Sequence, residues 1–332
     1  MTVFPVTTST LSAKELGEFI QEKYALNGNF SCKLFRTGMN HTYFLSDHEA
    51  KYIVRVYSHK WRSKSEIKEE LKLLNLLKGS DLSVSFPIED KKGEFIQEIN
   101  APEGIRYIVL FSFAKGEKIR FMDNETCSSI GTLMAKIHSL TNNRTIDRIS
   151  YNKESLIQLP YRQLQYFFSE KLPEMEFIKQ IGESFQNSDF DHIHNGVVHM
   201  DIWYDNMAVK NEKKITIFDF DFCGNGWQIL DVAYFCKQLF FIESDKKQYE
   251  LKVQSFLNGY QKIRKFSNKE LQLIPKAGVS VFVFYLGVQA KRFDWSNIFL
   301  TENYLKMFIG KIKSWMDYYE TREVTIHNNT YN

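Results

Sequence analysis

The sequence has little proline, little cysteine and almost no net charge for its length. Of 332 residues only 6 are proline, whereas 28 are phenylalanine and 17 are tyrosine, which favours packed cores over long linkers. The formal net charge is +3 and the charges are mixed along the chain, so there is no electrostatic case for nucleic-acid binding. The four cysteines lack C-x-x-C spacing, which favours reduced structural thiols over disulfides or zinc ligands: Cys32, Cys127, Cys223 and Cys236.

Targeting and membrane-spanning signals are also lacking. The first ten residues do not have the basic and then apolar profile of a signal peptide. The longest uncharged apolar run, 277–288, is too short to cross a bilayer and predicts a buried helix. We therefore expect a soluble cytoplasmic protein without a membrane partner, long enough for two lobes with large cores. The oligomeric state does not follow from the sequence.

What is present is a pattern typical of phosphoryl transfer. His199, Asp201 and Asn206 form H-x-D-x-x-x-x-N, in which a kinase uses the Asp to orient or accept the proton of an attacking hydroxyl and the Asn to hold a metal. An apolar strand then ends at Asp219, where a carboxylate would serve a second Mg²⁺ position. Each signal alone is weak, since three fixed positions recur by chance and an Asp often ends a strand. A short strand at 207–209 and a turn at 210–213 between them predict one hairpin that carries both groups.

Hydrophobic periodicity predicts the architecture. Five antiparallel strands with one inserted helix are expected first: strands at 32–35, 42–45, 52–57, 95–98 and 107–111, and the helix at 65–77. A capping box, Ser12 with Glu15, predicts an earlier helix that ends near 27–28. After a hinge that contains Gly116, the chain is helical, and Pro275 suits the first turn of a helix to 292; the helices are expected around 130–138 and at 160–170, 174–186, 230–241, 246–263, 268–274, 275–292 and 302–321.

These elements predict an α+β, two-lobed protein-kinase-like fold. Residues 1–111 would form a nucleotide-binding N-lobe and 112–118 the hinge. Residues 119–323 would form a mainly helical C-lobe with the catalytic hairpin, followed by a polar tail at 324–332.

The loop between the first two strands is ambiguous. It has only Gly38, not G-x-G-x-x-G, so an ordinary hairpin turn and a phosphate-covering loop both remain open. In the second case, backbone N–H groups near Asn40 would bind phosphates, with side-chain contacts from Asn40 and His41.

A cation and an acid are expected to form a phosphate clamp. Strand alternation puts Lys51 and Arg55 on one face, and Arg55 stands where most kinases carry a phosphate-binding Lys. Lys51 is the alternative cation. Glu70 lies on the inward stripe of the next helix, so we choose it over Glu69 as the paired acid, although a solvated surface acid is the competing interpretation.

Three further residues have predicted roles around the loop. His199 is expected to hydrogen-bond the loop rather than act as the base, although an imidazole side chain could serve as a base. Asp231, at a helix start, is the candidate partner that holds the loop, although helix capping alone would also explain it. Asp219 rather than Asp221 is expected to bind the metal, because it ends the apolar strand.

Taken together, these motifs resemble the aminoglycoside phosphotransferase and choline kinase family, the small-molecule branch of the protein-kinase-like fold. The family pattern is H-G-D-x-x-x-x-N, a strand ending I-D-F or V-D-L, and a later G-x-x-x-x-D-L. This chain has the matching segments His199 to Asn206, Phe218 to Phe220 and Gly226 to Val232. The similarity spans roughly 30–320 and looks closest to bacterial homoserine-kinase-like and stress-response-kinase-like members. Met200 replaces the usual Gly, and Arg55 the usual Lys.

The resemblance implies an ATP- and Mg²⁺-dependent transfer of the γ-phosphate to a small-molecule hydroxyl. It makes Asp201 the base, Asn206 and Asp219 the metal ligands, and Arg55 with Glu70 the clamp. Hinge backbone around 110–113, with Phe111 and Phe113, would hold adenine.

The acceptor is not implied by the resemblance. The apolar, aromatic segment 273–288, with Lys276, Lys291 and Arg292 in or near it, disfavours a polycationic aminoglycoside and suits a neutral or anionic acceptor. A protein Ser/Thr kinase and a nucleotide-binding pseudokinase are the alternative functions, and the presence of Asp201, Asn206 and Asp219 argues against the pseudokinase.

Overall fold

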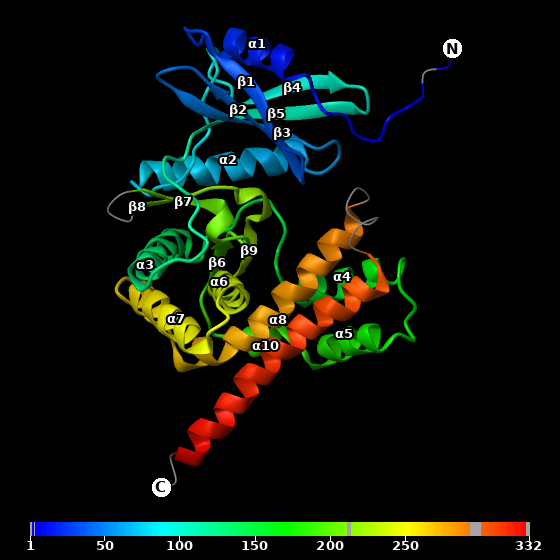
Figure 1. The fold of residues 1–332 in the computed structure, drawn as a ribbon, viewed down its shortest axis with the longest axis vertical. Coiled ribbons are helices and arrows are strands. Elements are labelled where there is room, and N and C mark those ends of the chain that lie inside the picture. The colour runs from blue at the N-terminus through cyan, green and yellow to red at the C-terminus, as the bar shows by residue number, and fades with distance from the viewer. Residues whose placement is uncertain (1, 3, 211–213, 293–299, 330–332) are drawn as a thin grey trace. The chain divides into compact units, whose positions relative to one another are not determined.

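The computed structural model describes residues 2, 4–210, 214–292 and 300–329, and the chain divides into two compact units (Figure 1). Unit 1 comprises Met1–Lys118 and Met207–Asp219, and unit 2 comprises Ile119–Asn206 and Phe220–Asn332. The break after Lys118 agrees with the predicted hinge at 112–118. The predicted hairpin turn spans 210–213, of which 211–213 lie outside the described residues and Lys210 is the last residue of a strand.

The hairpin at 207–219 belongs to unit 1, whereas the sequence placed it in the C-lobe. Its strands are β7 (Met207–Lys210) and β8 (Lys214–Ile217). Val209 and Glu117 exchange two backbone hydrogen bonds of 2.9 Å. The Ile217 backbone N–H donates to the Ser83 carbonyl at 3.1 Å, and the Ile217 carbonyl accepts the Ser85 N–H at 3.0 Å. These backbone bonds, which no side-chain pattern reports, attach the hairpin to unit 1.

Unit 1 contains the predicted five-stranded antiparallel sheet, in the order β1-β2-β3-β5-β4. The elements are α1 (Ala13–Tyr24), β1 (Ser31–Arg36), β2 (Asn40–Ser46), β3 (Lys51–Tyr57), α2 (Lys64–Gly79), β4 (Ile96–Ala101) and β5 (Gly104–Ser112). Figure 1 shows α1 and α2 on opposite faces of the sheet. Val54 and Val56 pack into a core with Leu16 and Ile20 of α1. Because side chains alternate along a strand, Arg55 between them faces α2.

The first helix begins after Ser12 as predicted, but its cap and its end differ from the prediction. Ser12 makes no side-chain hydrogen bond to the α1 backbone, so the expected capping box is not formed there. Its hydroxyl instead contacts the Glu15 carboxylate. The helix ends at Tyr24 rather than near 27–28, because Ala25 adopts a left-handed conformation with φ of 48°. A complete capping box is found on α2, between Ser63 and Glu66.

Unit 2 is mainly helical, as predicted. Its helices are α3 (Asn124–Thr141), α4 (Leu159–Leu164) after a π-turn (Glu154–Gln158), α5 (Pro173–Ser184), α6 (Ile229–Ile242), α7 (Lys246–Gln261), α8 (Asn268–Lys291) and α10 (Glu302–Asn329). Two short strands, β6 (Asn195–Val198) and β9 (Gly224–Trp227), pair next to the catalytic loop. Helix α3 packs on α7, and α8 packs on α4, α6 and α10.

Three helix predictions for unit 2 were wrong. Helix α4 ends at Leu164 instead of 170, where the chain turns and buries Phe168. Pro275 lies inside a continuous α8 rather than starting a new helix, and its carbonyl accepts a hydrogen bond from the Trp315 indole at 2.9 Å. Helix α10 continues to Asn329 through the expected polar tail, because 322–329 contain no Gly or Pro to stop it.

Helix α8 is apolar for most of its length. Within the described chain it meets the length and composition criteria for a membrane span, but 67% of its apolar window is buried inside the protein. Helix α8 is therefore a mostly buried helix of unit 2 that packs on α4, α6 and α10, in agreement with the buried helix predicted for 277–288.

Candidate active site

The predicted clamp in unit 1 is formed by direct contacts. Arg55 is buried, and its Nη1 donates to Glu70 Oε1 at 2.8 Å while its Nη2 donates to Asp219 Oδ1 at 2.9 Å. Tyr57 donates its hydroxyl to the other Glu70 oxygen at 3.1 Å. The guanidinium also lies 5.0 Å from the centre of the Phe111 ring. The predicted pairing of Arg55 with Glu70 is confirmed, and its part in phosphate binding stays a prediction.

The competing cation and acid are engaged elsewhere. The Lys51 ammonium lies 4.2 Å from the Phe44 ring centre and 4.3 Å from that of Phe113. Glu69 pairs with Lys72 at 2.6 Å, whereas Glu70 is fully buried. Strand register and helix phase therefore bring Arg55 and Glu70 together, and they direct Lys51 and Glu69 to other partners.

The turn between β1 and β2 does not depend on its glycine. A Cβ at Gly38 would meet nothing closer than 3.8 Å, and Gly38 does not need a positive φ. The Asn40 side-chain oxygen accepts the Ser58 backbone N–H at 3.3 Å, which ties the start of β2 to the end of β3. In contrast, Gly116 in the hinge has φ of 130°, and a Cβ there would lie 2.5 Å from the Val209 carbonyl oxygen. The glycine that the local backbone requires is thus in the hinge.

Asp219 presents an accessible carboxylate at the end of the hairpin. Its side chain is 42% exposed, whereas Asp221 is buried. The strand ends at Ile217, and Asp219 has φ of 67°, a left-handed conformation that is uncommon outside glycine and often found at functional sites.

The donor groups suit Mg²⁺. Carboxylate and amide oxygens are hard ligands, and Mg²⁺ is usually held by one or two carboxylates together with phosphate oxygens. The described residues contain no cluster of three or more His, Cys, Asp or Glu that would form a complete protein cage. Asp219 stays the predicted metal ligand of unit 1 and Asn206 that of unit 2, and an ion held by such groups would take its remaining ligands from phosphate and water.

Changing Arg55 should weaken nucleotide binding in a graded way. We expect Arg55→Lys to keep partial activity with a raised KM for ATP, because it keeps the charge but loses the two-pronged geometry. Arg55→Ala should raise that KM about 10–100-fold, the range for losing hydrogen bonds to charged groups. Initial rates at varied ATP measure both. Lys51→Ala is the control, and a normal KM in Arg55→Ala with a raised KM in Lys51→Ala would assign the clamp to Lys51.

The catalytic-loop motif lies in unit 2, between β6 and a short 3₁₀ helix, Tyr204–Asn206. The Asn206 amide nitrogen donates to the Asp201 carboxylate at 2.6 Å and to the Asp201 backbone carbonyl at 3.0 Å. Tyr234 on α6 donates its hydroxyl to the second carboxylate oxygen of Asp201. The predicted base and one predicted metal ligand are therefore adjacent, and both oxygens of the base are oriented.

Asp231 supports this loop from the first turn of α6. Its two carboxylate oxygens accept the backbone N–H groups of His199 at 2.8 Å and Met200 at 2.7 Å. His138 Nε2 lies 3.0 Å from Asp231 Oδ2. Burial alone would raise the pKa of the Asp231 carboxyl, but the hydrogen bond and charge of His138 and the contacts with His199 hold that pKa below its usual value. The predicted loop-holding role of Asp231 is confirmed.

Met200 and His199 complete the loop. Met200 has φ of 67°, which explains why glycine is usual there in the family that the motif resembles. Its side chain is fully buried, and its carbonyl accepts the Tyr285 hydroxyl at 2.9 Å, so tertiary contacts hold the uncommon backbone. His199 accepts the Asp201 backbone N–H at 3.1 Å through Nδ1, which is the structural role predicted for it.

Comparison with known proteins now adds independent support. A profile described as the phosphotransferase enzyme family matches residues 31–266. The chain belongs to this family. The resemblance to the aminoglycoside phosphotransferase and choline kinase family is thereby confirmed, with the protein-kinase-like fold that it implied, and homoserine kinases are among the similar proteins.

Three similar proteins illustrate the relation. An uncharacterized protein of Synechocystis, sll1119, is 28% identical over 240 residues. The match covers 70% of this chain and 66% of the relative, which is just under two thirds of the relative's length. A homoserine kinase of Bradyrhizobium diazoefficiens is 24% identical over 298 residues, covering 87% of this chain and 86% of the kinase. A structure of the amicoumacin kinase hAmiN in complex with AMP-PNP, Ca²⁺ and Ami has a TM-score of 0.73 at 18% identity, covering 92% of this chain and 94% of that one.

Sequence reasoning missed the residues that flank the predicted base, Asp201, in this phosphotransferase. Tyr234 and Tyr285 hold Asp201 and Met200, and neither belongs to the family motif. One signal was available for Tyr234, which stands three residues after Asp231 and so shares its face of α6. No sequence signal connected Tyr285 with the loop, because α8 is more than eighty residues downstream.

Replacing Asp231 should destabilise the phosphotransferase measurably. Asp231→Asn leaves buried donors unsatisfied, so we expect a loss of about 3 kcal/mol in the free energy of unfolding at pH 7. Because the folded pKa is lowered, the stabilisation is complete above the unfolded pKa of about 4 and is lost as pH falls through the folded value. In urea unfolding, the difference in the free energy of unfolding between wild type and Asp231→Asn should therefore narrow as the pH falls from 5 to 3.5.

A partly exposed acid provides the control for that measurement. Asp189 contacts Lys276, and both side chains are about one-third exposed, so Asp189→Asn should cost about 1 kcal/mol or less. Equal losses at the two positions would contradict a special role for Asp231.

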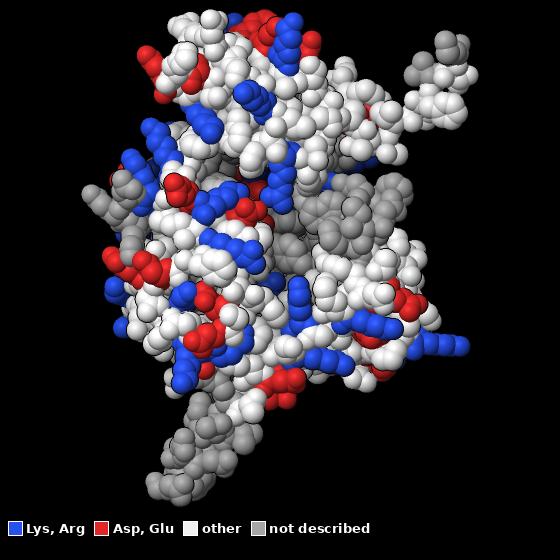
Figure 2. Space-filling view, in the orientation of Figure 1, with Lys and Arg blue, Asp and Glu red and all other residues white. Residues whose placement is uncertain are grey.

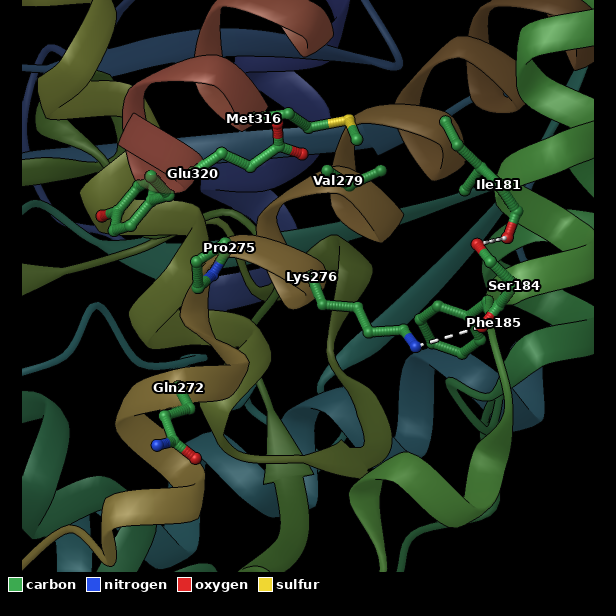
Figure 3. A pocket seen from close by; sticks show the side chains of 10 residues that line it. Ile181, Ser184, Phe185, Gln272, Pro275, Lys276, Val279, Met316 and Glu320 are labelled. Carbon is green, nitrogen blue, oxygen red and sulfur yellow. Dashed lines mark hydrogen bonds between the residues drawn. The ribbon is translucent and has the colours of Figure 1, made fainter. Parts of the chain in front are cut away.

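A separate cavity of about 320 Å³ lies in unit 2 between α5, α8 and α10 (Figure 3). It is lined by Ile181, Ser184, Phe185, Gln272, Pro275, Lys276, Val279, Met316, Tyr319 and Glu320. Figure 3 shows Lys276 extending toward the end of α5, where its Nζ donates to the Ser184 carbonyl at 3.2 Å, and it also contacts Asp189. The charge of Lys276 is therefore neutralised within the protein.

The surface carries both signs of charge. Figure 2 shows basic and acidic side chains interspersed over the visible face, without a broad field of one sign. This distribution matches the near balance of 43 basic and 40 acidic residues in the sequence.

Proposed function

We propose that this protein transfers the γ-phosphoryl group of ATP, with Mg²⁺, to a hydroxyl group of a small molecule. The observation that carries the proposal is the Asp201 carboxylate, oriented by Asn206 and Tyr234 in a loop held by Asp231. Family membership supports it, as do the names of a homoserine kinase and an amicoumacin kinase among the similar proteins.

The proposed reaction is an in-line displacement at phosphorus. The acceptor oxygen forms a bond to the γ-phosphorus while the bond from phosphorus to the bridging oxygen of ADP breaks, and Asp201 receives the hydroxyl proton. Arg55 neutralises phosphate charge, and Glu70 keeps the guanidinium in place. Mg²⁺, held by Asn206 and Asp219 when bound, would supply further neutralisation of the phosphate oxygens.

The experiment is a screen for acceptor-dependent ADP release. Purified protein would be tested with ATP and Mg²⁺ against alcohols, amino alcohols, hydroxy acids, aminoglycosides and casein. We expect a phosphorylated small molecule, identified by mass spectrometry, and no product with Asp201→Asn or with EDTA. Phosphorylated casein alone would instead favour a protein Ser/Thr kinase. Nucleotide binding without turnover across the whole panel would favour a pseudokinase.

A further inference from the structure

Helix α6 carries a buried lysine that the proposed reaction does not use. Lys237 is only 5% exposed, although lysine is among the residues least often buried without a partner. It lies three residues after Tyr234, so both side chains project from the same face of α6.

The ammonium of Lys237 is surrounded by aromatic rings. Its Nζ lies 4.7 Å from the ring centre of Tyr234, 4.3 Å from that of Phe282 and 5.7 Å from that of Tyr285. Phe282 and Tyr285 come from α8, so two helices build the box. Ring faces attract a cation, but they do not neutralise it as a carboxylate does.

Two buried arginines of unit 1 have acidic partners, whereas no such pair involves Lys237 in the described chain. Arg55 pairs with Glu70 at 2.8 Å, and Arg106 with Glu103 at 3.5 Å. Among the described residues, no carboxylate forms an ion pair or a hydrogen bond with Lys237. A buried charge without a counter-ion is costly, and burial lowers the pKa of Lys237 to about 7. In the part of the chain that the structure describes, the box therefore holds an amino group with no carboxylate in direct contact with it.

The box is continuous with the residues that hold the base. The Tyr234 hydroxyl is bonded to Asp201, and the Tyr285 hydroxyl is bonded to the Met200 carbonyl. Lys237 thus lies one aromatic ring away from the carboxylate that would receive the acceptor's proton. The nearby charged groups are Asp201, which attracts the ammonium, and Lys311 on α10, which repels it.

We infer that Lys237 binds a carboxylate group of the acceptor, so that the preferred acceptors are small hydroxy acids. This inference rests on the proposed function, because it names the acceptor class of the same site. A single ammonium matches a monoanion better than a phosphate, which needs more than one cation. Amino alcohols are disfavoured, because the ammonium of the protein already occupies the aromatic surface that would receive theirs. Lys276 is not an alternative anion-binding residue, since it already contacts Asp189.

The test uses acceptors that differ only in charge. Three acid–amide pairs are suitable, formed by 3-hydroxypropionate, 4-hydroxybutyrate and L-homoserine with their primary amides. Two amino alcohols, 3-aminopropan-1-ol and 4-aminobutan-1-ol, complete the panel. We expect at least one acid to exceed its amide by 10-fold or more in kcat/KM, with the amino alcohols lowest. In Lys237→Met, the KM for that acid should rise about 10–100-fold, the range for a lost charge-assisted hydrogen bond, while the amide is unaffected. Lys237→Arg should retain part of the preference.

Lys247→Met is the matched control, because it removes the same charge from an exposed position on α7, away from the ring box. It should behave as wild type with every acceptor. Thermal unfolding of each variant checks the fold, and Lys237→Met should be at least as stable as wild type because it removes a buried charge. If Lys237→Met does not fold, Lys237→Arg and the acid-to-amide ratio of the wild type decide the question.

Calorimetric titration of the acids without nucleotide separates this inference from the proposed function. Suppose that the acids bind the wild type but not Lys237→Met, while the wild type does not phosphorylate them. That result would support the inference and contradict the proposed function. The inference is overturned if no acid binds the wild type more tightly than its amide. It is also overturned if Lys237→Met binds and uses the acids as wild type does.

Discussion

Replacing Asp201 by alanine is expected to lower turnover by about 10²–10⁴-fold, the range for removing a positioned general base. The loss should appear in kcat, because Asp201 interacts with the acceptor proton that moves during transfer. ATP affinity should stay nearly unchanged, since Asp201 lies in unit 2 and the predicted clamp, Arg55 with Glu70, lies in unit 1.

Two other substitutions in unit 2 provide graded comparisons with Asp201→Ala. Tyr234→Phe keeps the base but removes one hydrogen bond that orients it, so we expect less than about 10-fold loss. Asp191→Ala removes an exposed acid of the same unit and should have no effect on the rate. Steady-state rates together with nucleotide binding by fluorescence or calorimetry measure these differences. Equal losses of turnover and of ATP affinity in Asp201→Ala would show that Asp201 acts on the nucleotide instead.

The second large effect concerns Asp219. Asp219→Asn should lower kcat about 10²–10³-fold at ordinary Mg²⁺ concentrations, because a metal ion supplies several kcal/mol of transition-state stabilisation. Asparagine has nearly the same shape and tolerates the left-handed backbone found at this position, so the change removes charge with little strain. A raised Mg²⁺ concentration for half-maximal rate should accompany the loss.

Asp221 is the discriminating neighbour of Asp219. It is buried, so Asp221→Asn should lower thermal stability while leaving the Mg²⁺ requirement unchanged. Activity as a function of Mg²⁺ concentration, followed by a Mn²⁺-soaked crystal structure with anomalous data, measures both. A metal bound by Asp221 alone would reverse the assignment.

The chemical groups were predictable because their spacing along the chain is itself a signal. His199, Asp201 and Asn206 lie within one short loop, and Asp219 follows on the next hairpin, so local sequence was sufficient to propose them. Arg55 and Glu70 were paired correctly because strand alternation and helix periodicity fix which side chains project to the same side. Asp231 was found for a related reason, since it stands in the first turn of a helix.

Tertiary structure alone decided where other segments belong. Backbone bonds from Val209 and Ile217 attach the catalytic hairpin to unit 1, and backbone groups carry no residue identity by which a sequence could reveal this. Pro275 was expected to begin a helix, but packing against Trp315 and the neighbouring helices maintains α8 through it.

The surroundings of the base were also beyond the reach of the sequence. Tyr285 and Phe282 meet Lys237 and the loop only because α8 packs against α6, and long-range packing has no local signature. The sequence by itself therefore determined the family, the fold class and the groups proposed for phosphoryl transfer, because these depend on local spacing and periodicity. The tertiary structure decided which side chains orient Asp201 and which buried lysine lies near it, because helix packing brings together residues that are distant in the chain.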